Sequence, residues 1–304
     1  MPGSNTIAGS GTDRHLLVVV NARASSTEEP HWLLSDLDSS LRAAGARPET
    51  ILTHSEDDLA NALAGADGRR VVLVGGDGSV HAAVNAVDEL PEIALVPAGR
   101  ANNIARAFGI PGRVAEAAQV AATAAARPVD LLRVNSAGGC MYCVEALSAG
   151  LQADARARYH ADNSGDLREG ARSLAEALRR YRPYELHLEA DGEPAYDGEA
   201  AQLFLSNLPY FGFGFRVDPM ANPADGLLEA IVLQAESRLE AVGMLLAAYR
   251  GRHLNNGHAT VVRAHEASFR SPLPLTCDGV PLGVGRASVA VDPGKLRLAA
   301  PWSR

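Results

Sequence analysis

Residues 71–85 read VVLVGGDGSVHAAVN, and this stretch decides the fold of the first half of the chain. An apolar run typical of a buried strand passes through a glycine-rich turn directly into a helix. Glycines let main-chain N–H groups approach a ligand closely, and a helix N-terminus adds unpaired donors with a partial positive charge. The stretch therefore predicts an anion-binding turn whose natural occupant is phosphate.

A second turn of the same kind follows the next predicted strand. Residues 94–106 read ALVPAGRANNIAR, so that Gly99 comes shortly after an apolar run. Taken alone, the first turn is better explained as a tight connection capped by Asp77 and Ser79. Because neighbouring strand ends of an open α/β sheet form the crevice where ligands bind, two such turns predict a nucleotide-phosphate site.

Strands and helices alternate on both sides of these turns. The predicted strands are residues 15–20, 49–53, 70–74, 93–96 and 131–134, and the predicted helices are residues 32–44, 57–64, 80–88, 101–108 and 114–125. Alternation at this spacing predicts an open, Rossmann-like parallel sheet with helices on both faces over residues 14–135. Residues 1–13, rich in Gly, Ser and Thr, are expected to form a flexible tail.

After residue 136 the pattern changes to short strands separated by turn signals. Strands are expected at residues 184–190, 200–206, 228–233, 260–269, 287–291 and 296–299, and helices at 166–181 and 239–250. Residues 136–304 are therefore predicted to form a second, mostly antiparallel domain.

Composition excludes several classes of function. The formal charge is −8 and Lys295 is the only lysine, so the chain has neither a G-x-x-x-x-G-K-[ST] phosphate loop nor the V-A-I-K strand of protein kinases. The acidic balance predicts no nucleic-acid partner. Three cysteines cannot make a disulfide framework, which favours a cytoplasmic location, and Cys140 and Cys143 are expected to be buried apolar thiols.

Several motifs resemble the diacylglycerol kinase catalytic-domain superfamily of lipid kinases, which includes sphingosine kinases. GGDGS at 75–79 resembles its G-G-D-G-T loop, and PAGRANNIAR at 97–106 resembles its P-x-G-T-x-N-D/N-x-A-R turn. Weaker matches follow in the family's order at Asn21, His81, Asn207 with residues 212–215, residues 223–229 and residues 276–279. The resemblance covers residues 15–300.

The resemblance implies an α/β domain that holds ATP against a C-terminal β-sandwich, and transfer of the γ-phosphoryl group, with Mg²⁺, to a diacylglycerol- or sphingoid-like hydroxyl. It implies catalytic roles for Asp77 and Asp278, and a structural Mg²⁺ turn at Asp225 with the carbonyls of Asn222 and Leu227. The nucleotide contacts that it implies are Asn21, Gly75, Gly76, Asp77, Gly78, Ser79, Gly99, Arg100, Asn102 and Asn103.

Three positions depart from the family pattern. Two family glutamates are replaced by Ala82 and Val280, and Arg100 stands in place of a threonine. Two other readings therefore stay open: a catalytically weakened nucleotide-binding pseudokinase and a soluble NAD kinase. The sequence also leaves the oligomeric state open, including a homodimer. Residues 154–182, with seven arginines against five acidic residues, suit either peripheral membrane contact or a solvated helix.

Overall fold

The computed structural model describes residues 14–22, 30–158, 167–212, 214–255 and 257–302. The first half contains four parallel strands in the order β2 (Ala46–Thr53), β1 (Arg14–Asn21), β3 (Arg70–Gly75) and β4 (Ile93–Pro97). The middle strands are apolar and buried throughout their centres because helices cover the sheet on both faces. The predicted open parallel sheet is confirmed.

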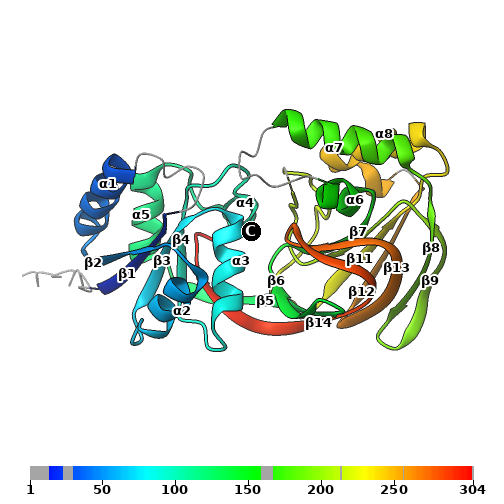
Figure 1. Ribbon diagram of the computed structural model, residues 1–304. Coiled ribbons are helices and arrows are strands. Elements are labelled where there is room, and N and C mark those ends of the chain that lie inside the picture. Colours follow the sequence, from blue (N-terminus) through cyan, green and yellow to red (C-terminus); the bar gives the residue numbers. More distant parts are fainter. Residues whose placement is uncertain (1–13, 23–29, 159–166, 213, 256, 303–304) are drawn as a thin grey trace, which may run out of the picture.

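In the part of the chain that the structure describes, five helices cover this sheet. They are α1 (Pro30–Ala43), α2 (Glu56–Ala64), α3 (Asp77–Ala86), α4 (Asn103–Ala107) and α5 (Val114–Thr123). α1 packs against α5, and α2 packs against α3 (Figure 1). α3 and α4 begin at the two glycine turns, where β3 and β4 end, so both turns lie at the same edge of the sheet.

The second half is mostly antiparallel, as the turn signals predict. Its strands are β5 (Ala126–Ser136), β6 (Gly139–Cys143), β7 (Ala146–Gly150), β8 (Tyr184–Ala190), β9 (Glu193–Ala200), β10 (Gln202–Ser206), β11 (Leu228–Leu233), β12 (Ala259–Ala264), β13 (Glu266–Cys277) and β14 (Val280–Ala299). Leucine, valine and alanine side chains from these strands form a second core.

Three helices gather at one end of this second half, over β7 and β11 (Figure 1). They are α6 (Leu151–Arg158), α7 (Leu167–Arg180) and α8 (Arg238–Tyr249), and a 3₁₀ turn, η1 (His253–Asn255), follows α8. α6 packs against α7, and α7 against α8. Among the described residues, no helix is both long and apolar enough to cross a membrane.

Strand β14 joins the two halves of the molecule. It pairs with β13 and β5 in the second half, and its last residues, Leu298 and Ala299, pair in parallel with Ile93 and Ala94 of β4. In Figure 1 this strand is the red ribbon that runs below the gap between α3 and the second half. The end of the chain thus completes the sheet that begins it, and both halves are held in one hydrogen-bonded framework.

Some sequence predictions need correction. The strand expected at 131–134 belongs to β5, which is antiparallel to β14 rather than part of the parallel run. The strand expected at 260–269 is divided at His265 into β12 and β13, whereas 287–291 and 296–299 belong to one strand that continues through an irregularity between Asp292 and Leu296. Cys140 is exposed, because it lies in the exposed first half of β6, for which β5 is the one partner among the described strands, whereas Cys143 is buried as expected.

Candidate active site

The two glycine turns touch each other. β3 runs into Gly76, which precedes α3, and a Cβ atom placed on Gly76 would lie 2.9 Å from the Cα of Gly99. The Ala98 N–H donates to the carbonyl of Gly75 at 2.9 Å. Because neither glycine has room for a side chain, the main chains of the two turns approach as closely as a shared phosphate site requires.

The N-terminus of α3 is not capped by a side chain, which argues against the plain capped turn. The side chain of Asp77 instead reaches the second turn, where its Oδ1 accepts the N–H of Ile104 at 2.9 Å. Ser79 is buried, and its hydroxyl packs against Gly75. The Ser79 N–H donates to the Gly76 carbonyl at 3.0 Å, so only the main-chain N–H groups before Ser79 could serve an anion at this helix N-terminus.

The asparagines of the second turn have different roles. Asn102 adopts a left-handed conformation, with φ +48°, and its side chain bonds both the N–H and the carbonyl of Gly99, so it shapes the turn. Asn103 is buried and donates through Nδ2 to Glu145 Oε2 at 3.1 Å and to the Gly212 carbonyl at 2.7 Å. Its Oδ1 has no hydrogen-bond partner among the described residues, so this buried oxygen is available to a ligand.

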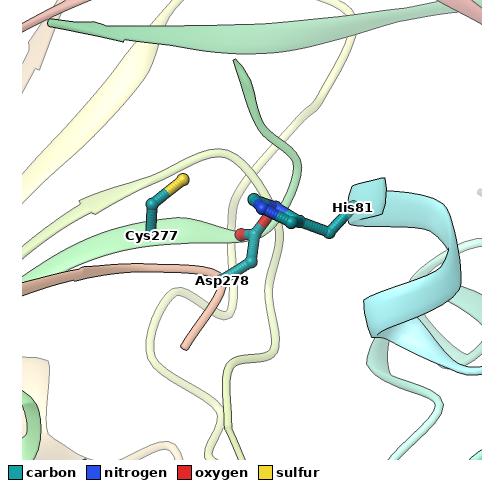
Figure 2. Close-up of side chains that lie close together, drawn as sticks. All are labelled: His81, Cys277 and Asp278. Carbon is teal, nitrogen blue, oxygen red and sulfur yellow. The ribbon is translucent and has the colours of Figure 1, made fainter. Parts of the chain in front are cut away.

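Asp278 lies across the gap from α3, in the two-residue turn between β13 and β14. Asp278 and Gly279 both have positive φ, +47° and +81°, as an Asp-Gly hairpin turn requires. His81 of α3 donates through Nδ1 to Asp278 Oδ2 at 2.9 Å, which links the two halves of the chain (Figure 2). The Asp278 side chain is only 4% exposed.

The carboxylate of Asp278 anchors the connection between β6 and β7. It accepts the main-chain N–H groups of Val144, Glu145 and Ala146 at 2.7 to 3.2 Å and the thiol of Cys143 at 3.1 Å. Burial alone would raise the pKa of Asp278, but the hydrogen bonds from His81, the main chain and Cys143 outweigh it and lower that pKa. Asp278 is therefore a charged, fully occupied anchor.

His81, Cys277 and Asp278 bring ligand-type atoms within 4.8 Å of one another (Figure 2). A metal would need free carboxylate oxygens and thiolates. The Asp278 oxygens are already occupied. The hydrogen bond with Cys143 would lower the pKa of the Cys277 thiol, but burial and the charges of Asp278 and Glu145 outweigh it and raise that pKa above its ordinary value. This cluster is thus part of the anchoring network.

Glu145 is the site residue that sequence reasoning missed. It lies in the bend between β6 and β7, is only 4% exposed, and its N–H is held by Asp278. Burial is the main cause that raises the pKa of Glu145 well above its ordinary value, and the charges of Asp77 and Asp278 add to it. The sequence signal that could have pointed to Glu145 is its position as the one charged residue in the otherwise uncharged stretch YCVEALSAG, residues 142–150.

Asp77 shares this environment. Burial raises its pKa, and the charge of Asp278 adds to the shift, whereas the main-chain N–H groups of Ile104 and Asn103 oppose it. Two carboxyl groups with raised pKa values therefore face one space. Such pairs are typical of catalytic and cation-binding sites.

One cavity of about 480 Å³ connects these carboxyl groups with an apolar interior. Asp77, Asn103, Glu145 and Asp278 line its polar part, and Arg100 and Arg156 add positive charge. The rest of the lining is mostly apolar and includes Leu174, Phe204, Phe211, Phe215, Leu233, Met244, Leu245 and Ala248. Helices α7 and α8 supply much of this apolar wall.

The remaining predicted residues lie outside this cavity lining. Asn21 ends β1, whose neighbour β3 leads into the Gly75 turn. The Asp225 carboxylate accepts the N–H of Leu227 at 3.1 Å and forms an ion pair with Arg263, while the Asn222 carbonyl accepts the Ala224 N–H. The Mg²⁺ turn at these residues stays a prediction, and Val280 is 38% exposed outside the cavity.

The anomalous burial of Glu145 predicts a measurable effect on stability. Above its ordinary pKa of 4.5 the glutamate ionises in the unfolded chain but retains its proton in the fold, so the free energy of unfolding falls as pH rises toward the raised folded pKa. Glu145→Gln should therefore melt about 3 °C higher than the wild type at about pH 8 and show little difference near pH 4.5. Calorimetry on the ligand-free wild type and variant measures the melting temperatures at both pH values.

Glu185→Gln, at an exposed position of β8, serves as the matched control and should shift neither melting temperature. If Glu145→Gln melts below the wild type at both pH values, the buried carboxyl stabilises the fold and our account of its protonation is wrong.

Comparisons with known proteins identify the family of the chain. Residues 15–134 match the model of the diacylglycerol kinase catalytic domain, and residues 145–300 match the YegS C-terminal NAD kinase beta sandwich-like domain. The chain is 28% identical over 301 residues to "Probable lipid kinase YegS-like" of Stenotrophomonas maltophilia, covering 93% of this chain and 95% of that protein.

Two further relatives carry the name of diacylglycerol kinase. One, from Bacillus subtilis, is 28% identical over 218 residues, which cover 69% of this chain and 70% of that protein. The other is the crystal structure of a diacylglycerol kinase from Bacillus anthracis, which shares the fold with a TM-score of 0.71 at 18% identity and covers 95% of this chain and 97% of that one. The resemblance seen in the motifs is confirmed: the chain belongs to the diacylglycerol kinase catalytic-domain superfamily, with a diacylglycerol kinase catalytic domain followed by a YegS-type C-terminal domain.

Proposed function

We propose that the protein is an ATP- and Mg²⁺-dependent lipid kinase that phosphorylates a diacylglycerol- or sphingoid-like hydroxyl. The observation that carries this proposal is a cavity in which buried carboxyl groups meet an apolar interior. Such a cavity suits an amphiphile, whose polar end reaches the carboxyl groups while its hydrocarbon tail lies among Phe204, Phe211 and Phe215. NAD, which is polar along its whole length, does not suit this lining.

In the proposed reaction the lipid hydroxyl oxygen attacks the γ-phosphorus of ATP, and the bond from that phosphorus to the β–γ bridging oxygen breaks to release ADP. The hydroxyl proton passes to Asp77, whose pKa is raised by burial and therefore lies closer to the working pH than that of an ordinary aspartate. The glycine turns and the α3 N-terminus would hold the phosphates, with Arg100 beside them.

The oxygen atoms of this site fit a magnesium ion. Asn103 offers a buried Oδ1 without a partner, and Asp77 and Glu145 offer carboxylate oxygens, which are the ligands that Mg²⁺ prefers. When bound, the ion neutralises charge on the phosphates. Glu145 would then provide the carboxylate that the family motif loses at Val280.

Asp278 enters this proposal as a positioning residue. Its carboxylate holds the N–H groups around Glu145 and the ring of His81, and burial leaves it little contact with solvent. It thereby fixes Glu145 relative to α3, which carries Asp77. Its main effect on transfer would come through the placement of these two carboxyl groups.

The cavity assignment predicts a selective defect in lipid use. Ala171 lies on α7 where the cavity meets the surface, so Ala171→Trp should partly block the entrance. We expect kcat/KM for a short-chain, monomerically dispersed diacylglycerol to fall about tenfold, with the KM for ATP unchanged. Steady-state kinetics with labelled ATP separate the two effects.

Ala175→Trp is the control, because Ala175 is exposed on the same helix but does not line the cavity. Equal lipid kinetics for the two variants would contradict the cavity as the lipid site. If the wild-type protein binds ATP but phosphorylates no lipid, the protein is a nucleotide-binding pseudokinase. If it transfers phosphate to NAD instead, it is an NAD kinase.

A further inference from the structure

Helix α8 carries apolar side chains on two sides. Its inner side packs into the second half, where Met244, Leu245 and Ala248 line the cavity. Its outer face is formed by Leu239, Val242, Leu246 and Tyr249, which are 82, 37, 52 and 62% exposed. The spacing of three and four residues places these four side chains on one side of the helix. The outer face of α8 is therefore left uncovered by the residues that the structure describes.

The outer face is continuous with the lining of the cavity. The ring of Tyr249 packs edge-on against that of Phe215, with centroids 5.7 Å apart and planes at 79°. Phe215 lines the cavity, so Tyr249 joins the exposed apolar surface to the interior in which we place the lipid tail. α7 lies beside α8 at the same end of the molecule, away from β14 (Figure 1).

Positive charge borders this apolar surface, although the whole chain has a net charge of −8. Exposed arginines flank the two ends of α8: Arg238, Arg250 and Arg252. Residues 236–252 contain three arginines and two glutamates, and residues 170–182 of the neighbouring α7 segment contain four arginines and one glutamate, so both segments keep a net positive charge. Apolar residues bordered by arginines are typical of helices that lie in the interface of an anionic bilayer.

We propose that the outer face of α8 docks the protein on an anionic lipid bilayer, with Leu239, Val242, Leu246 and Tyr249 inserted between the headgroups. The proposal goes beyond the proposed function, since it names the surface through which the protein meets the membrane, and it rests on that function only for the claim that the cavity holds a lipid. Docking on this side brings the cavity wall formed by α8 against the membrane. The substrate could then move between the bilayer and the cavity without exposing its tail to water.

Vesicle binding tests the proposal without requiring catalysis. The full-length protein is sedimented with vesicles of phosphatidylcholine and phosphatidylglycerol, and with vesicles of phosphatidylcholine alone. We expect binding to the anionic vesicles, stronger at low salt, and a loss of about tenfold or more in the partition coefficient for the double variant Leu239→Glu/Leu246→Glu. Both side chains are exposed and neither lines the cavity, so the fold should be retained, as thermal melting checks.

The double variant Leu52→Glu/Val284→Glu changes two exposed apolar side chains elsewhere, 47 and 56% exposed, and should bind as the wild type does. A second variant, Arg250→Glu/Arg252→Glu, should weaken binding to anionic vesicles only. The proposal is overturned if the wild type ignores anionic vesicles or if the α8 variants bind them normally. It is also overturned if the α8 substitutions instead dissociate a dimer in sedimentation velocity.

The kinase assay on dispersed substrate separates this proposal from the proposed function. The α8 double variant should phosphorylate short-chain lipid in solution at the wild-type rate but lose activity on substrate embedded in anionic vesicles. Vesicle binding without transfer to any lipid would refute the proposed function and leave the docking surface standing.

Discussion

Asp77→Asn should reduce phosphoryl transfer to lipid by about a thousandfold while leaving the fold and ATP binding in place. Asparagine has the same shape, and its Oδ1 can still accept the N–H of Ile104, which Asp77 holds at 2.9 Å. What is lost is the group that accepts the hydroxyl proton and one carboxylate ligand for Mg²⁺. Initial rates with labelled ATP and dispersed lipid measure the loss, and an ATP-dependent rise in melting temperature measures binding.

Asp88→Asn is the matched control, because Asp88 is an exposed aspartate just after the end of the same helix. It should transfer phosphate at the wild-type rate. An Asp77→Asn variant with nearly normal turnover would show that another group accepts the proton, and Glu145 would be the first candidate because it lines the same cavity.

Gly76→Val should lower the affinity for ATP by about a hundredfold. A Cβ on Gly76 would lie 2.9 Å from the Cα of Gly99 and 3.5 Å from its nitrogen, so the two turns must separate. Separation moves the main-chain N–H groups that the phosphates would contact. Isothermal titration calorimetry with ATP and Mg²⁺ measures the affinity directly.

Gly112→Val is the control, since a Cβ at this exposed glycine meets no atom within 4 Å. It should bind ATP as the wild type does. Unchanged affinity in a folded Gly76→Val protein would mean that the nucleotide does not lie on the paired glycine turns.

The first half of the fold could be predicted because its signals are local. A buried apolar strand, three glycines and a helix follow one another within residues 71–85, and the structure places β3, the turn and α3 there. The sequence signals of the second half are less local. β14 was expected as two strands because the irregularity between Asp292 and Leu296 interrupts its pattern, and pairing with β13 and β5 makes it one.

A sequence motif can point to those residues of the candidate site that lie in one loop, but not to residues that only tertiary contacts bring there. Asp77 and the glycines follow from the G-G-D-G-S sequence, whereas Glu145 has no motif. Glu145 is held in its buried position by Asp278, which accepts its main-chain N–H and lies 133 positions away in the sequence. Likewise, His81 meets Asp278 across 197 positions, and the apolar cavity is assembled from separate helices and strands.

The most direct test of the central claim is transfer of the γ-phosphate from labelled ATP, in the presence of Mg²⁺, to a panel of diacylglycerols, sphingoid bases and NAD, with wild type and Asp77→Asn compared side by side. Our account predicts labelled lipid phosphate from the wild type, a nearly complete loss with Asp77→Asn, and no labelled NADP. Labelled NADP, or no labelled product from a wild-type protein that binds ATP, would contradict it.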